Sequence, residues 1–160
     1  MVVGDKRCGI SSSLAVRENE KNLNYYIVVP YFATLIGGVA SNILFGPLSI
    51  VGYLVGGLGD AAGEPVGTRW GKHRYAIPGF GKGAATRSYE GSLGVLIACL
   101  IALLIGVAIS PFLHFGVRTL IALPAIAIAC TLVEAVSPHG WDNTPMQFVP
   151  TLLVAAFLSQ

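Results

Sequence analysis

Long runs of apolar residues are the feature that most restricts how this chain can fold. A helix needs about 20 mostly apolar residues to cross a bilayer, and three runs, 25–45, 93–113 and 117–136, meet that length. A fourth, 48–67, is as long but carries two carboxylates, and a fifth, 148–160, is shorter. Only 11% of the residues are charged, against about 25% in soluble domains. We therefore predict an all-α, polytopic transmembrane helix bundle of about five spans.

The positive charges are distributed unequally around these spans. Counting crossings places the segments 1–24, 68–92 and 137–147 on one side of the membrane. The first two segments hold nine of the ten Lys and Arg residues, and only Arg118 falls on the other side. Because Lys and Arg accumulate in cytoplasmic segments, we expect a flexible cytoplasmic tail over 1–24, followed by a transmembrane domain over 25–160 with a cytoplasmic loop at 68–92.

Two carboxylates interrupt the second apolar run, within the stretch "GDAAGEPVG" at 59–67. Asp60 and Glu64 are four residues apart, which places both on one face of a helix. An acid near the centre of a span costs roughly 2.5–3.5 kcal/mol, and such residues usually mark a site. Pro65 also frees the carbonyl of Ala61 from its helical bond, and these oxygens suit Mg²⁺. The alternative is that the span ends before the acids, but about 12 apolar residues are too few to cross.

Glycines at positions 59, 63 and 67 form a stripe along the same run. Small residues spaced four apart allow another helix backbone to approach closely. We therefore expect this helix to be packed inside the bundle.

The loop 68–92 is rich in glycine and in positive charge. Arg and Lys side chains beside flexible backbone amides are one way in which proteins bind polyphosphates. The loop nevertheless contains neither a P-loop nor a dinucleotide-binding fingerprint. The other interpretation is a basic loop that sets the topology and contacts anionic lipid headgroups.

Two further acids lie at the ends of the third and fourth spans. Glu90, in "RSYEGS", is explained by helix capping, since Ser88 or Thr86 could cap the helix and an acid is favourable in its first turn. Glu134 lies near a helix C-terminus, where a negative charge opposes the helix dipole. Helix capping therefore does not explain Glu134.

Asp142 and Asn143 follow in "SPHGWDNTP", which is typical of a turn. By the count of crossings, five of the eight acids lie at or near the membrane face that carries the basic loop. Carboxylates beside Arg and Lys suit a substrate in which a metal ion bridges phosphate oxygens.

Three ordered motifs of this chain resemble the CTP-dependent polyprenol kinase family. They are "GDAAGEPVGTRWGKHRY", "RSYEGS" and "LVEAVSPHGWDNTPMQFVP", and the resemblance covers roughly residues 50–150. The family includes dolichol, phytol and farnesol kinases and a CTP-dependent diacylglycerol kinase, and it has a distant similarity to phosphatidate cytidylyltransferase. Its members commonly have more spans before the first motif, so we expect a shortened member.

The resemblance implies that 25–160 is a catalytic domain with CTP as phosphoryl donor and Mg²⁺ as cofactor. The expected catalytic residues are Asp60, Glu90, Glu134 and Asp142, and the choice of general base between Glu90 and Glu134 stays open. The expected metal ligands are Asp60, Glu64 and Asp142. The expected nucleotide-binding residues are Arg69, Lys72, Arg74, Lys82, Arg87, Ser88 and Asn143.

The predicted function is transfer of the γ-phosphoryl group of CTP to a lipid alcohol, an isoprenoid alcohol or diacylglycerol, at the cytoplasmic face. One alternative is a phosphatidate cytidylyltransferase, which would make a CDP-lipid. Another is a small transporter or a non-catalytic membrane protein, because acids within spans also serve ion coupling. The partners expected are therefore a membrane lipid and CTP, with no nucleic acid, and the sequence gives no indication of oligomeric state.

Overall fold

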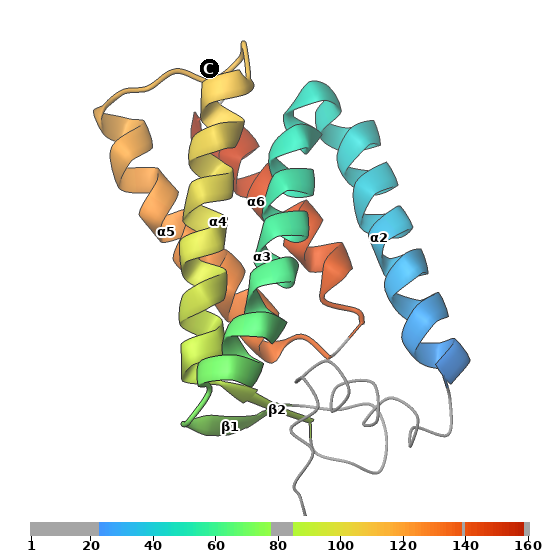
Figure 1. Cartoon of the computed structure of the whole chain (residues 1–160). Helices are drawn as coiled ribbons and strands as arrows, with labels where there is room; N and C mark the ends of the chain where they lie inside the picture. The colour runs from blue at the N-terminus through green and yellow to red at the C-terminus, as the bar shows by residue number, and fades with distance from the viewer. Residues whose placement is uncertain (1–22, 78–84, 139, 159–160) are drawn as a thin grey trace, which may run out of the picture.

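The computed structural model describes residues 23–77, 85–138 and 140–158. Within these ranges, five α-helices lie side by side and a small β-hairpin lies at one end of them (Figure 1). The elements, in chain order, are α2 (Leu23–Phe45), the 3₁₀ helix η1 (Gly46–Leu48), α3 (Ser49–Trp70), β1 (Arg74–Ile77), β2 (Ala85–Ser88), α4 (Tyr89–Ile109), α5 (Val117–Val136) and α6 (Asn143–Leu158). The predicted all-α helix bundle is confirmed.

Among the described residues, three helical stretches are long and apolar enough to cross a membrane. They are Val28–Trp70, Tyr89–Ile109 and Val117–Val136. The first comprises α2 and α3, which η1 folds into an antiparallel pair (Figure 1). α6 is shorter, with 16 residues. These lengths identify an integral membrane protein, whereas the side on which each end lies stays a prediction.

The turn between α2 and α3 depends on Gly46. Its φ of +55° lies in the left-handed region, which glycine adopts without the steric cost that other residues meet. Pro47 follows inside η1, where its fixed φ is compatible with a tight helical turn. This turn lies at the end of the bundle opposite the hairpin (Figure 1).

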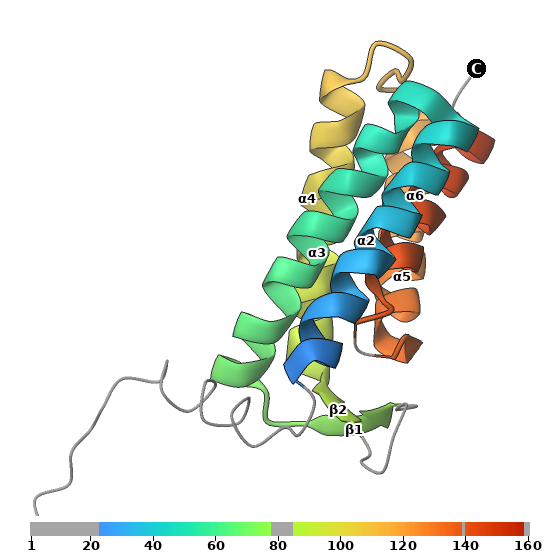
Figure 2. The same ribbon diagram turned by 90° about the vertical axis from the view of Figure 1, so that its right-hand side faces the viewer.

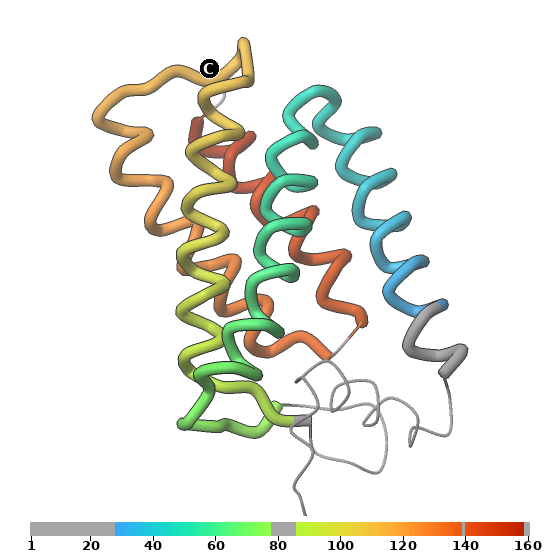
Figure 3. The backbone as a smooth tube through the Cα atoms, in the orientation of Figure 1, coloured from blue at the N-terminus to red at the C-terminus, as the bar shows by residue number. Residues whose placement is uncertain are grey.

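The hydrophobic core lies between α3, α4, α5 and α6. Buried residues from all four helices contribute to it, among them Val55, Val95, Leu103, Ile126 and Met146. α2 lies at one edge of the bundle, as the traced backbone shows (Figure 3), and in front of the other helices when the bundle is seen from that side (Figure 2). Large apolar side chains, such as those of Ile43, Ile97 and Ile121, remain exposed on the outer faces. In a membrane protein these faces contact lipid.

The glycine stripe of α3 packs against its neighbours as expected. A Cβ atom at Gly59 would lie 2.8 Å from Met146 Cε, and one at Gly63 would lie 2.9 Å from Val95 Cγ2. These distances are shorter than real Cβ contacts, so glycine at both positions favours the close approach of α4 and α6. Both nearest atoms belong to side chains, and the end of Met146 is flexible enough to shift.

The helix ends differ from the predicted spans because local capping, and not hydropathy, sets them. The apolar run 93–113 predicts α4, and the helix starts earlier, at Tyr89. Of the two predicted caps, Ser88 is confirmed, since its hydroxyl accepts a hydrogen bond from the Gly91 N–H at 3.1 Å. α6 was expected to start at 148 but starts at Asn143, where the Met146 N–H donates to the Asp142 carbonyl at 3.0 Å.

The segment 68–92, expected to be a loop, contains structure that the sequence did not indicate. α3 extends to Trp70, and β1 and β2 form an antiparallel pair in which Arg74 lies opposite Ser88. Each strand has only four residues, too few for an alternating pattern to stand out. The residues between the strands lie outside the described ranges.

Candidate functional site

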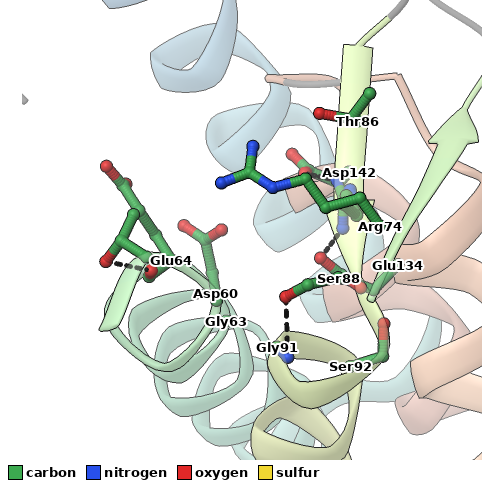
Figure 4. Close-up of a pocket in the computed structure, with 13 residues that line it drawn as sticks. Asp60, Gly63, Glu64, Arg74, Thr86, Ser88, Gly91, Ser92, Glu134 and Asp142 are labelled. Atoms are coloured by element: carbon green, nitrogen blue, oxygen red, sulfur yellow. Dashed lines mark hydrogen bonds and ion pairs between the residues drawn. The ribbon is translucent and has the colours of Figure 1, made fainter. Parts of the chain in front are cut away.

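A pocket of about 210 Å³ lies at the hairpin end of the bundle (Figure 4). Its walls come from α3, both strands, the first turn of α4, the end of α5 and the turn before α6. Predicted site residues from all three sequence motifs line it: Asp60, Glu64, Arg74, Arg87, Ser88, Glu134 and Asp142. Segments far apart in the sequence therefore meet in one pocket.

α3 provides the carboxylate wall of the pocket. The side chains of Asp60 and Glu64 are exposed and lie on the same side of the helix (Figure 4), as their spacing predicts. Gly63 and Gly67 also line the pocket, and their lack of side chains keeps the space beside these acids open. Pro65 lies inside α3 without ending it.

The opposite wall is built around the guanidinium group of Arg87, on β2. It forms an ion pair with Glu134 of α5, and its Nη2 donates to Asp142 Oδ2 at 2.8 Å. The three side chains are 15%, 11% and 6% exposed, respectively. Buried charges are stable only when they are paired, so this arrangement joins β2, α5 and the turn before α6. It also places the described parts of 68–92 and 137–147 at the same end of the bundle, as the count of crossings predicts.

The two buried acids differ in what remains open to a ligand. Asp142 Oδ1 accepts from the Gly140 N–H at 3.1 Å, so both oxygens of Asp142 have partners. Glu134 Oε2 is buried and has no hydrogen-bond partner among the described residues. An unsatisfied buried oxygen costs about 1–3 kcal/mol, which a ligand that donates to it would recover.

Two predicted site residues bind other parts of the protein and do not line the pocket. The Glu90 carboxylate is 2.8 Å from His73 Nδ1. The Asn143 amide donates to Thr34 Oγ1 at 3.0 Å and to the Pro30 carbonyl at 3.4 Å, which holds the start of α6 against α2.

The basic residues of 68–92 separate into two groups. Arg74 and Arg87 line the pocket, whereas Arg69 and Lys72 do not. The Arg69 guanidinium lies 5.2 Å from the centre of the Trp70 ring, and both it and Lys72 are exposed. The predicted nucleotide-binding residue Lys82 lies outside the described residues.

Two hydroxyl residues of the pocket, Thr68 and Thr86, were missed as site residues in the sequence. Thr68 continues the spacing of four that relates Asp60 to Glu64, so the helix periodicity could have identified it. Thr86 alternates with Ser88 along β2, a strand that was not expected. Ser92 also lines the pocket, and it belongs to the motif "RSYEGS".

The charges of the pocket fit a divalent cation that arrives with a ligand. Within the described ranges, no three acidic, His or Cys side chains converge as a preformed metal site. The described pocket residues include four carboxylates and two guanidinium groups, so negative charge is in excess by two. Mg²⁺ usually binds one or two carboxylates, keeps several waters and takes its other ligands from substrate phosphates. The donor set therefore suits this ion.

The chain is similar in sequence to a phytol kinase from Synechocystis sp. The two are 34% identical over 123 residues, which cover 76% of this chain and 49% of the relative. The chain thus spans about half the length of the curated relative it matches. No family model matches the sequence, and no solved structure matches it either.

Proposed function

We propose that this chain is a membrane-embedded lipid kinase of the polyprenol kinase type. It would transfer the γ-phosphoryl group of CTP to the hydroxyl of an isoprenoid alcohol such as phytol. The likeness to a phytol kinase supports this class of reaction. The observation that carries the proposal is that Arg87, Glu134 and Asp142 meet across one pocket from Asp60 and Glu64.

Asp60 and Glu64 are the residues that we propose hold Mg²⁺, which would offset the charge of the phosphates. Asp142 stays a predicted ligand, but both its oxygens are already hydrogen bonded. Its proposed role is therefore to orient Arg87. A triphosphate would be repelled by the excess negative charge of this pocket unless a divalent cation came with it.

Arg74 and Arg87 are the proposed phosphate-binding residues, together with the hydroxyls of Thr86 and Ser88. The pocket volume of about 210 Å³ is below the roughly 300–1,000 Å³ of pockets that enclose a drug-sized ligand. It suits the phosphates better than the whole nucleotide. The preference for CTP over ATP follows from the family resemblance and belongs to the proposal.

Glu134 is the proposed general base that removes the proton from the alcohol. A base must come within hydrogen-bond reach of the proton it takes. Glu134 lines the pocket, and its buried Oε2 has no hydrogen-bond partner among the described residues. Glu90 lies outside that lining. Of the two acids that the sequence left open, Glu134 therefore has the geometry for this role.

The lipid substrate would reach the pocket directly from the membrane. Exposed aromatic side chains of Trp70, Tyr89 and Trp141 lie at the same end of the bundle as the pocket. Trp and Tyr concentrate at the headgroup level of a bilayer. A long-chain alcohol with its hydroxyl at that level would present it to the pocket while its tail stays in lipid. We place this end at the cytoplasmic face because it carries the basic residues.

The direct test is an assay of the purified protein in detergent with Mg²⁺, CTP labelled in its γ-phosphate, and phytol, farnesol or diacylglycerol. We expect label in a lipid monophosphate, less label with ATP as donor, and transfer lowered about 10²- to 10³-fold with the D60N variant. Label that remains in the nucleotide with every alcohol would contradict the proposal. A CDP-lipid formed from phosphatidate would instead assign cytidylyl transfer.

A further inference from the structure

Two motif residues, His73 and Glu90, do not line the pocket although their chain neighbours do. His73 directly precedes Arg74, and Glu90 lies in the first turn of α4, which Ser88 caps. Their side chains are 77% and 27% exposed. The proposed transfer reaction assigns no role to either of them.

Glu90 ties the start of the hairpin to α4. Each of its carboxylate oxygens accepts from the His73 backbone N–H at 3.3 Å, and one of them is 2.8 Å from His73 Nδ1. The Tyr89 N–H donates to the His73 carbonyl at 3.0 Å. Both backbone groups of His73 and its ring are thus held by the first turn of α4.

A second attachment to α4 lies two residues after His73, at Tyr75 in β1. The Tyr75 hydroxyl is hydrogen bonded to Ser92 Oγ at 2.7 Å, and the Tyr75 ring lies 5.0 Å from the Tyr89 ring. Successive side chains of a strand point to opposite faces. With His73 and Tyr75 both turned toward α4, the intervening Arg74 points away from it, and its side chain extends across the pocket toward the acids of α3 (Figure 4).

We propose that Glu90 is a positioning residue, which fixes β1 through His73 and thereby directs the guanidinium group of Arg74 into the pocket. A two-stranded hairpin is marginally stable by itself, so its direction depends on what holds it. This inference rests on the proposed function for the role of Arg74 in phosphate binding. It replaces the expectation that Glu90 takes part in the chemical step.

The kinetic test is a double-mutant cycle of E90A and R74A with CTP as the varied substrate. Because Glu90 accepts the hydrogen bonds that hold His73, we expect E90A to raise KM for CTP roughly ten- to a hundredfold and to change kcat far less. Because Glu90 acts through Arg74, the double variant should be no worse than R74A alone. E90Q keeps an oxygen that accepts from the His73 N–H and should recover most of the loss, and R118Q, at the other end of the bundle, should match the wild type.

A general base would give the opposite pattern. E90A and E90Q would both lose kcat with little change in KM, and the loss would multiply with that of R74A. Either result would overturn the positioning role.

Hydrogen exchange of the protein in nanodiscs separates this inference from the proposed function. We expect E90A to speed amide exchange in 73–77 and 85–89 and to leave α5 unchanged. Unchanged exchange in both strands would overturn the inference whatever the activity. Faster exchange together with a wild type that phosphorylates no alcohol would support the attachment by Glu90 and contradict the kinase.

Discussion

The two halves of α3 use the same small residues in contrasting ways. In the first half, a Cβ atom at Gly52 would lie 2.1 Å from the Gln147 carbonyl oxygen, so α6 fills all the space beside it. In the second half, Gly63 and Gly67 pack against side chains, since a Cβ atom there would lie 2.9 Å from Val95 Cγ2 and 3.0 Å from Ser88 Oγ, but they also line a pocket beside two exposed acids. The comparison teaches that contact with the backbone of α6 fixes the first half of this helix, whereas one face of the second half remains available for ligands. It also predicts which substitutions affect folding and which affect only activity.

The largest effect is expected from G52A, in the closely packed half. Overpacking a core usually costs about 1–3 kcal/mol and occasionally more. A Cβ atom at Gly52 would overlap the backbone of Gln147, which cannot move aside, so we expect a cost above that range and above that of R87A. We expect little folded protein, as measured by size exclusion and thermal unfolding in detergent. The matched control is G57A, because a Cβ at Gly57 meets nothing within 4 Å. Equal stability of the two variants would contradict the contrast between the two positions.

The second-largest effect is expected from R87A. This variant tests whether a residue of the pocket also stabilises the fold. Removing the guanidinium group leaves Glu134 and Asp142 buried without their cation, which costs about 3–5 kcal/mol in comparable cases. We expect a lower unfolding temperature and loss of phosphate transfer together. Adding E134Q and D142N should restore stability without activity. Recovery of activity in that triple variant would show that Arg87 has no role in phosphate binding.

D60N, in the second half of α3, should lower activity without lowering stability. Losing one group that stabilises charge in the transition state typically lowers kcat about 10²- to 10³-fold. The Asp60 side chain is exposed and the amide has the same shape, so the unfolding temperature should change little. Transfer rates and thermal unfolding on one preparation give both quantities. A variant that transfers phosphate at the wild-type rate would remove Asp60 from the proposed metal site.

The smallest effect is expected from R69Q combined with K72Q, just beyond the pocket. Both side chains are exposed and lie outside its lining, and exposed charges contribute at most about 1 kcal/mol. We therefore expect KM for CTP to rise less than about fivefold, and less than in R74Q. A larger rise in KM for CTP than in R74Q would show that Arg69 and Lys72 bind the nucleotide, as the sequence predicts.

The fold could be predicted from the sequence to the extent that it depends on long apolar runs. Those runs identified the helices, and counting their crossings indicated that 68–92 and 137–147 share one end of the bundle. The apolar runs do not set the helix ends, because individual hydrogen bonds do. The Ser88 cap of α4 could be predicted from "RSYEGS", whereas the start of α6 at Asn143 could not. The hairpin escaped prediction since its strands are short and depend on α4 for support.

The site was predictable where helix periodicity applies and not where tertiary contacts decide. The spacing of Asp60 and Glu64 was enough to place them on one face. Nothing in the sequence shows that Arg87 joins Glu134 and Asp142, or that Glu90 and Asn143 bind protein groups outside the pocket. Those facts depend on how separate helices approach each other.

The hydrogen bonds from Asn143 to α2 have a mechanical consequence. α2 lies at one edge of the bundle. It accepts hydrogen bonds from the side chain of Asn143, which directly follows the pocket residue Asp142. A bilayer that tilts or shifts α2 would therefore transmit that movement to the pocket through Asn143 and through Thr144, whose hydroxyl donates to the Ala33 carbonyl at 2.7 Å. The rate of the proposed transfer should then vary with the acyl-chain length of the surrounding phospholipid, and N143A should weaken that dependence. The bilayer would in this way exert a mechanical force on the protein besides solvating its apolar faces.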